Sequence, residues 1–128
     1  MSDEIKPFLK YTFLGHFVIA VIFGVSLTIF PMGFADFINW PTEDLYFTRL
    51  TGALMLGFGL GSILAFRETS WEKVKLIVIC EVTWLVIGVG VQIYGIITVV
   101  SNFMSWANLL LLIGLVGLFG WSFFQQQK

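Results

Sequence analysis

Residues 74–91 read VKLIVICEVTWLVIGVGV, and this stretch decides the class of protein. Together with its flanks it is long and apolar enough to cross the hydrocarbon core of a bilayer, which takes about 20 residues of helix. Its middle carries Glu81. An acidic side chain at the centre of a membrane helix costs about 2.5 to 3.5 kcal/mol. The stretch therefore predicts a transmembrane helix, with Glu81 marking a site inside the membrane.

The composition of the whole chain supports a membrane protein. Of its 128 residues, 58% are hydrophobic and 12% are charged, with a mean hydropathy of +0.92. A soluble domain averages about 25% charged residues, so this chain would lack the polar surface that water requires. The net charge of −1 offers no basic stripe for nucleic acid. We expect one integral membrane domain over residues 1–128.

Four stretches are candidates for membrane spans, at about residues 11–30, 45–66, 71–99 and 104–124. They lack the alternation of polar and apolar residues that a membrane barrel shows. The sequence therefore predicts an all-α fold, an antiparallel bundle of four transmembrane helices.

The segments between these spans carry interfacial features. The loop at residues 31–44 mixes apolar and acidic residues and predicts an amphipathic piece in the membrane interface. Within this loop, Thr42 is the candidate N-cap of the following helix. Trp71 and Trp106 lie near span ends, where tryptophan commonly anchors a helix at the headgroups.

Basic residues cluster on one side of the expected bundle. Only Arg49 belongs to the other side, inside the second span. The positive-inside rule places the more basic side in the cytoplasm, so we expect both termini there and the protein in the plasma membrane. The six residues of the basic side are Lys6, Lys10, Arg67, Lys73, Lys75 and Lys128.

Ionisable residues of three spans share stripes with small or polar residues, read at helical spacing. Such stripes let helix backbones approach closely in a membrane. We therefore expect these faces to point into the bundle. The three stripes are Arg49 with Ala53, Gly57 and Gly61; His16 with Ala20, Gly24 and Thr28; and Glu81 with Trp84, Gly88 and Gln92.

Depth along each helix decides which of these groups can meet. Glu81 lies about ten residues, or roughly 15 Å, into its helix and so near the bilayer midplane. A long Arg49 side chain can close much of the remaining gap, so we expect a hydrogen-bonded Arg49–Glu81 ion pair. Gln92 would assist this pair, and His16 would join it through Tyr11, water or a ligand.

The candidate ligand-binding residues are Glu81, Arg49, Trp84, His16 and Gln92, with Trp84 as core filler or as the wall of a pocket. Two interpretations of the Arg49–Glu81 pair stay open. It is either part of a ligand or proton site, or a structural pair that only fixes helix register and stabilises the bundle by about 1 kcal/mol. The sequence shows no nucleophile constellation and no Cys/His metal set, so it names neither catalytic residues nor a cofactor.

The segment RLTGALMLGFGL, residues 49–60, resembles the R-x-x-G-A-x-x-L-G-x-G-L stretch of small four-helix DoxX-like membrane proteins, a group with many members of unknown function. The resemblance covers about the second and third spans. It implies an antiparallel four-helix membrane bundle, and some DoxX-like proteins are subunits of quinone-linked oxidoreductases. Of the residues in this segment, only Arg49 and Gly52 are carried over from the family.

Three functions remain open from the residues. The first is a protein that binds a lipophilic small molecule, such as a quinone, a sterol-like molecule or a lipid, in the bundle interior, or that serves as an accessory subunit of a membrane complex. The second is a small proton-coupled transporter that uses Glu81. The third is a membrane-embedded isomerase with Glu81 as acid or base. Membrane lipid is an expected partner, and a stripe of Gly114, Gly117 and Gly120 suggests a homo-oligomer or a larger complex.

Overall fold

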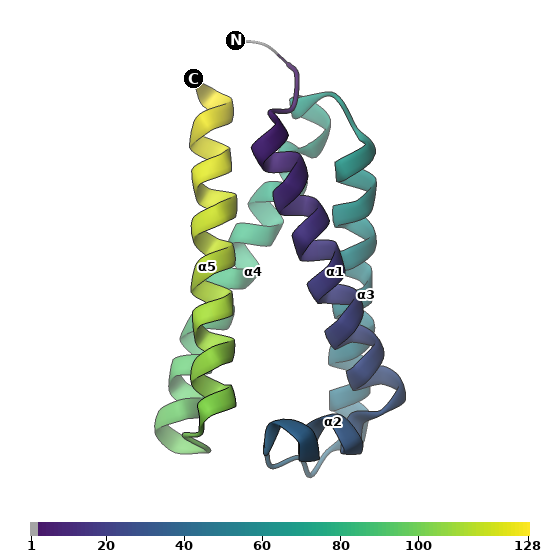
Figure 1. Ribbon diagram of the computed structural model, residues 1–128, viewed down its shortest axis with the longest axis vertical. Coiled ribbons are helices and arrows are strands. Elements are labelled where there is room, and N and C mark those ends of the chain that lie inside the picture. Colours follow the sequence, from purple (N-terminus) through teal and green to yellow (C-terminus); the bar gives the residue numbers. More distant parts are fainter. Residues whose placement is uncertain (1–2) are drawn as a thin grey trace.

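The computed structural model describes residues 3–128, which form five helices (Figure 1). Four of them, α1, α3, α4 and α5, are long and apolar enough to cross a membrane. The prediction of an all-helical chain with four spans is confirmed, and the span ends fall within a few residues of the expected ones. The helices are α1 (Pro7–Ile29), α2 (Pro31–Ile38), α3 (Leu45–Arg67), α4 (Trp71–Thr98) and α5 (Phe103–Gln127).

Local sequence explains where several helices begin and end. Proline occupies the start of α1 and of α2, where its missing N–H would have no helical partner. The cap of α3 is Asp44, whose Oδ1 accepts hydrogen bonds from the backbone of Tyr46 and Phe47 at 2.9 and 3.1 Å. The expected cap at Thr42 is wrong, because a carboxylate directly before the helix satisfies two free N–H groups at once.

The helices form two pairs, α1 with α3 and α4 with α5 (Figure 1). Both termini and the α3–α4 turn lie at one end of the molecule, here the terminal end. The short helix α2 and the α4–α5 turn lie at the other, here the loop end. Although α3 and α4 follow one another in the chain, each packs far more closely against its pair partner than against the other.

Close packing within the α1–α3 pair depends on small residues. A Cβ added to Gly52 would lie 2.8 Å from the backbone oxygen of Gly24, and one added to Gly59 would lie 3.2 Å from the Cβ of Ala20. The side chain of Thr28 also presses on Gly52. The expected inward face of the first span is therefore confirmed at Ala20 and Gly24, which are buried.

The expected inward face of the second span is wrong. Arg49, Ala53 and Gly57 are exposed, and a Cβ added to Gly57 would have no atom within 4 Å. The buried face of α3 instead carries Gly52 and Gly59, followed by Ser62 and Ala65, about half a turn away at 3.6 residues per turn. Two small-residue stripes run along this helix, and α1 packs on the one that keeps the Arg49 charge at the surface.

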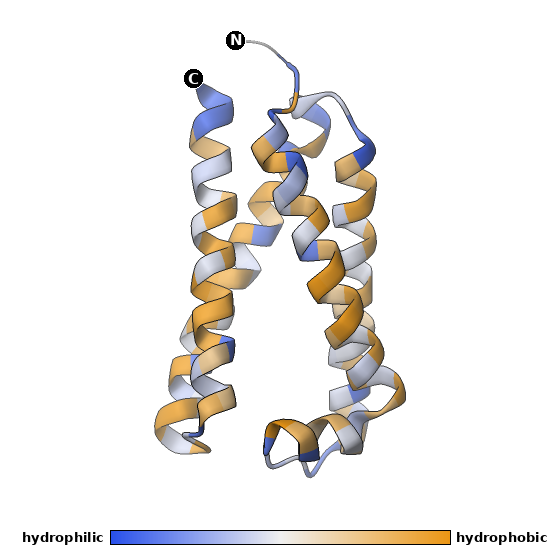
Figure 2. Cartoon of the chain, in the orientation of Figure 1, coloured by the Kyte–Doolittle hydropathy of each residue, from blue (hydrophilic) through white to orange (hydrophobic). Residues whose placement is uncertain are grey.

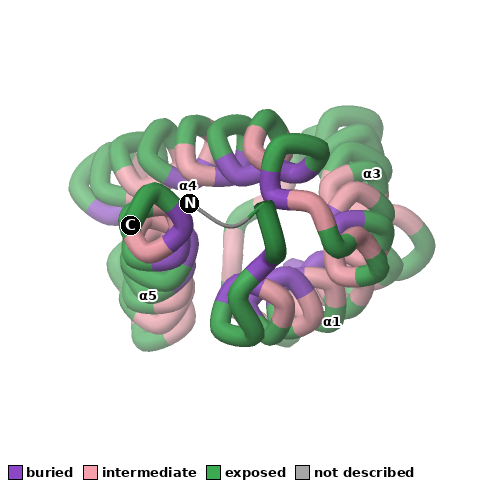
Figure 3. Tube along the Cα trace, turned by 90° about the horizontal axis from the view of Figure 1, so that it is seen from above, coloured by how far each residue is buried: buried purple, intermediate pink, exposed green. Residues whose placement is uncertain are grey.

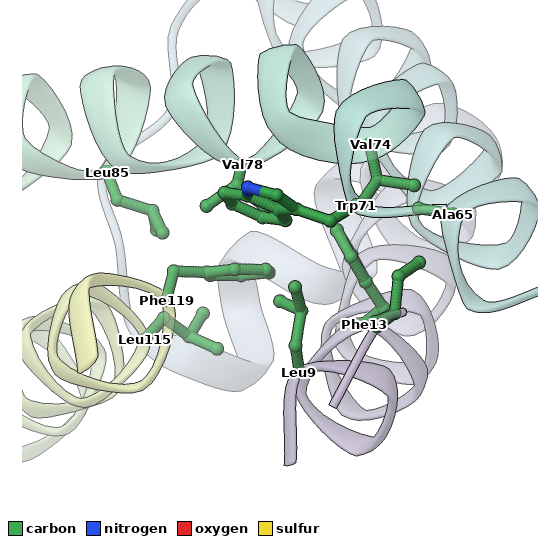
Figure 4. Packing of buried hydrophobic residues seen from close by; sticks show 10 residues of the cluster. Leu9, Phe13, Ala65, Trp71, Val74, Val78, Leu85, Leu115 and Phe119 are labelled. Atoms are coloured by element: carbon green, nitrogen blue, oxygen red, sulfur yellow. The ribbon is translucent and has the colours of Figure 1, made fainter. Parts of the chain in front are cut away.

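The hydrophobic core lies in the terminal half and joins the two pairs (Figure 4). Phe13 of α1 meets Phe119 of α5 with ring centroids 5.5 Å apart. Trp71, expected at the membrane interface, is only 5% exposed and packs 5.7 Å from the ring of Phe123. The indole is therefore part of the protein core and not a headgroup contact, because it points inward and packs against the end of α5. Near this end, the buried segments of α1, α4 and α5 face one another (Figure 3).

Residues 3–6, here the N-terminal segment, close the terminal end of the bundle. The backbone N–H of Ile5 donates to the carbonyl of Thr69 at 3.0 Å, and that of Lys6 donates to Oε1 of Gln126 at 2.7 Å. The Ile5 side chain is 3% exposed and belongs to the core. The segment thus ties the α3–α4 turn to the last turn of α5.

In the loop half the two pairs stand apart (Figure 1). After Leu85 the next buried residue of α4 is Ile96. At the loop end, Nδ2 of Asn102 donates to the carbonyl of Asn39 at 2.7 Å. The Trp40 ring lies close to Gly95, at 3.5 Å from a Cβ added there. A core joins the pairs at one end, and a small contact joins them at the other.

The outer surface suits a bilayer. Apolar residues cover the long helices, whereas the most hydrophilic ones gather toward the ends (Figure 2). Gly114 and Gly117 of α5 are exposed, and an added Cβ would meet nothing within 4 Å at either.

Candidate functional site

Glu81 lies in the interior of the bundle, where its side chain is held by residues of three helices. It is 1% exposed. Its Oε1 lies 3.3 Å from the Ser62 hydroxyl of α3 and 3.5 Å from Nδ1 of His16 in α1. Its Oε2 accepts a hydrogen bond from the Trp84 indole N–H at 2.6 Å. These four residues, Glu81, Ser62, His16 and Trp84, are here called the Glu81 cluster.

The hydrogen bonds of this cluster run in one direction. The Ser62 hydroxyl donates to Glu81, so its proton is not available to the His16 ring that lies 2.8 Å from the same oxygen. Nδ1 of His16 therefore donates to the Ser62 hydroxyl, which in turn donates to the Glu81 carboxylate. When the ring is protonated, His16 and Glu81 form a buried ion pair across the α1–α4 interface.

Aromatic rings enclose the polar groups. Trp84 stacks on Phe58 of α3 with centroids 5.3 Å apart and an interplanar angle of 28°. Phe119 of α5 meets the His16 ring edge-on at 5.6 Å. Every membrane-spanning helix therefore contributes to the surroundings of the cluster, which explains why Glu81 tolerates this depth: it keeps three polar partners while the rings exclude water.

The expected partner of Glu81 is wrong. Arg49 is exposed near the start of α3, and within residues 3–128 the ion pair of Glu81 is made with His16. Arg49 lies 13 residues, or about 20 Å of helix, before Ser62 on α3, so it is at a different level of the bundle from Glu81. His16, expected to join only through an intermediary, instead lies within direct reach of the carboxylate.

Gln92 is also separate from the Glu81 cluster, although it shares a helix face with it. Its Nε2 donates to the carbonyl of Ser105 at 3.0 Å, and its Oε1 accepts from Nδ2 of Asn108 at 2.9 Å. These bonds join α4 to α5. Of the five candidate residues, the structure brings together Glu81, His16 and Trp84 and leaves Arg49 and Gln92 elsewhere.

Ser62 is the member that the sequence interpretation missed. It is fully buried and bridges His16 and Glu81. A usable signal was present, because Ser62 follows Gly59 by three residues and precedes Ala65 by three on the same helix face. The sequence favours the stripe that begins at Arg49 as the inward face instead, because that stripe carries a charged residue.

The cluster lies where the two helix pairs begin to part. The buried residues of α4 recur every three or four positions from Trp71 through Glu81 to Leu85, and then stop until Ile96. Trp84, Gly88 and Gln92, on the same face, are half-buried. The polar groups therefore lie at the edge of the packed half, next to the region where α4 is less covered.

The geometry constrains the chemistry. Serine, histidine and a carboxylate occur together, but the hydroxyl lies between the ring and the carboxylate rather than at the end of the relay, as hydrolytic triads require. Residues 3–128 hold no group of three or more His, Cys, Asp or Glu side chains placed to bind a metal ion. The arrangement is suited to accepting hydrogen bonds and to passing a proton between His16 and Glu81 through Ser62.

No family model, no curated protein and no solved structure matches this chain.

Proposed function

We propose that this protein binds a lipophilic small molecule with a polar head, such as a quinone or a sterol-like molecule, beside the Glu81 cluster. The observation that carries the proposal is a buried carboxylate, bonded to Ser62 and Trp84, at the level where the cover of α4 ends. Ligand sites between helices combine apolar walls with a few converging polar groups. Intramembrane ionisable residues are functional by default.

Two features supply a way to recognise such a head group. Nε2 of His16 has no hydrogen-bond partner among residues 3–128, whereas Nδ1 is bonded to Ser62. The Trp84 ring is half-buried and, with Phe58, gives a flat apolar wall. A ligand would stack on this wall and exchange a hydrogen bond with the imidazole.

The setting of this activity follows from the charges. The six basic residues outside Arg49 belong to segments at or near the terminal end, so the positive-inside rule favours cytoplasmic termini in a plasma membrane. A role as an accessory subunit of a membrane complex is compatible with ligand binding. Membership of the DoxX-like proteins, for which residues 49–60 are the support, is also compatible with ligand binding. The exposed face of Gly114 and Gly117 would serve contact with a second copy or another subunit.

Purification in mild detergent followed by native mass spectrometry tests the binding proposal. We expect the wild type to retain an apolar molecule other than phospholipid, and Glu81→Gln and Trp84→Ala to retain it at least fivefold less. The first variant loses the carboxylate that orients Ser62 and, through it, the His16 ring, and the second loses the apolar wall; one hydrogen bond of about 1 kcal/mol corresponds to about fivefold. Arg49→Gln is the matched control and should retain it fully. A wild type that carries phospholipid alone, or equal retention by Glu81→Gln, would contradict the proposal.

A proton-coupled transporter is the second candidate, favoured by the continuous His16–Ser62–Glu81 chain of hydrogen bonds. In proteoliposomes with an imposed pH gradient, Glu81→Gln should then abolish proton-linked flux, while Arg49→Gln should not. Undiminished flux in Glu81→Gln would exclude this mechanism. The isomerase alternative ranks below both, because Ser62 and Trp84 already occupy the two carboxylate oxygens that an acid–base residue would offer to a substrate.

A further inference from the structure

A second candidate site lies at the terminal end, away from the Glu81 cluster. An open groove of about 480 Å³ runs between the N-terminal segment, the first turns of α1 and the end of α3. Its wall includes Glu4, Lys6 and Lys10 together with Tyr11 and Phe66. A volume of this size is typical of small-molecule sites, which span about 300 to 1,000 Å³.

The groove carries cationic groups that have no carboxylate partner. Lys10 is half-buried, and among residues 3–128 its ammonium makes neither an ion pair nor a hydrogen bond. The ammonium of Lys6 donates to the backbone carbonyl of Gln125, a neutral partner. The carboxylate of Glu4 also lines the groove, so its three charged side chains sum to +1. An ammonium without a counter-charge, held beside a second lysine in a groove, is placed to bind an anion.

The other wall is aromatic and lies at the end of the apolar spans. Tyr11 is 70% exposed and occupies the second turn of α1, and Phe66 lies in the last turn of α3. Tyrosine at such a position normally sits at headgroup depth. The groove thus sets cations beside a surface that faces lipid.

We propose that this groove binds the phosphodiester of an anionic membrane phospholipid. Lys6 and Lys10 hold the phosphate as point charges, and the acyl chains run along Tyr11 and Phe66 into the bilayer. Because Glu4 and Lys6 belong to the N-terminal segment, a bound lipid also stabilises the closure of the terminal end. This site does not depend on the Glu81 cluster or on its ligand.

Native mass spectrometry of the full chain in mild detergent, titrated with palmitoyl-oleoyl phosphatidylglycerol, tests this site. We expect Lys10→Gln to raise the Kd for the first bound lipid at least fivefold and Lys6→Gln/Lys10→Gln at least twentyfold. The matched control is Lys73→Gln/Lys75→Gln, which removes the same charge from the same end outside the groove and should change the Kd less than twofold. Lys10→Gln breaks no hydrogen bond or ion pair within residues 3–128, so we expect its fold to be preserved.

Two further probes distinguish the source of the phosphate. Phosphatidylcholine, whose choline adds a positive charge, should bind at least fivefold more weakly than phosphatidylglycerol. Soluble glycerol 3-phosphate at millimolar concentration should displace none of the lipid. Displacement by glycerol 3-phosphate, equal binding of the two lipids, an unchanged Kd in Lys10→Gln, or an equal loss in the Lys73/Lys75 control would each overturn the proposal.

Discussion

The terminal and loop halves of this bundle are held together by different means. In the terminal half, side chains of all four long helices interdigitate, with Phe13, Trp71 and Phe119 at their centre. In the loop half, α1 still presses on α3 through Gly24 and Gly52, but Asn102 provides the hydrogen bonds that cross between the pairs. Lipid is as apolar as a leucine side chain, so packing quality rather than hydrophobicity decides stability here. A half with a shared core therefore adjoins a half in which few contacts join the two helix pairs.

The largest expected effect comes from removing one core ring. Phe119→Ala in the terminal half leaves a cavity and should lower the free energy of unfolding by about 3 kcal/mol. Phe23→Ala, the matched change in the loop half, removes a half-buried ring that packs on Phe34 within its own half and should cost about a third as much. Denaturant titration in detergent measures both, and equal losses would contradict the contrast between the halves.

Helix pairing within the loop half depends on one glycine. Gly52→Ala places a Cβ against the Gly24 carbonyl and should cost about 2 kcal/mol through overpacking. Gly57→Ala, one turn away on the exposed face, should be neutral or stabilising by up to about 1 kcal/mol because alanine favours helix. The same unfolding titration tests this pair of variants. A reversed order would show that α1 packs on the Arg49 stripe after all.

The boundary between the halves is probed by its ion pair. Glu81→Gln removes the charge facing His16 while keeping the side-chain size, and should cost about 1 kcal/mol. Arg49→Gln should change stability by less than about 0.5 kcal/mol, as for a surface substitution. Thermal unfolding in detergent compares the two variants. Similar losses of stability in the two variants would favour an Arg49–Glu81 pair and contradict the pairing of Glu81 with His16.

The smallest effect concerns the pH dependence of the N-terminal segment. Hydrogen bonds from the Ser70 hydroxyl and from the Glu72 backbone amide hold the pKa of Asp3 below its usual value. The ionised Asp3 carboxylate therefore stabilises the docked N-terminal segment fully above its unfolded pKa, about 3.9. This stabilisation is lost as the pH falls through the lower pKa of Asp3 in the folded protein. Hydrogen-exchange protection of the Ile5 amide should decline below pH 4 in the wild type. Asp3→Asn should show a flatter pH profile, and identical profiles would refute this assignment.

Element type was readable from the sequence because a membrane leaves few choices for the backbone. Spans of 20 or more apolar residues must form helices, and Pro7, Pro31 and Arg67 mark where they begin or end. Glu81, His16 and Trp84 were identifiable for a related reason: an ionisable side chain at depth needs partners on an interior face. These are local properties of one helix at a time.

Helix pairing was not readable, because two faces of α3 carry small residues at similar spacing. The choice between them depends on how α1 crosses α3, which places Gly52 against Gly24 and turns Arg49 outward. The same choice brings Ser62 to Glu81. The interfacial role expected for Trp71 failed for a related reason, since its ring packs on Phe123 of α5. Such outcomes depend on contacts between distant parts of the chain, which spacing within a helix does not encode.

The bond between Lys6 and Gln126 has a consequence for assembly in the cell. It joins positions 120 residues apart, so it forms only after the last helix has entered the bilayer. The α1–α3 pair, by contrast, is complete within the first 67 residues and, as helices are made in order, we expect it to associate while α4 is still being synthesised. The N-terminal segment, made first, can reach Thr69 early but completes its contacts only when α5 is in place. Its docking on Gln126 therefore requires that the last helix has entered the bilayer.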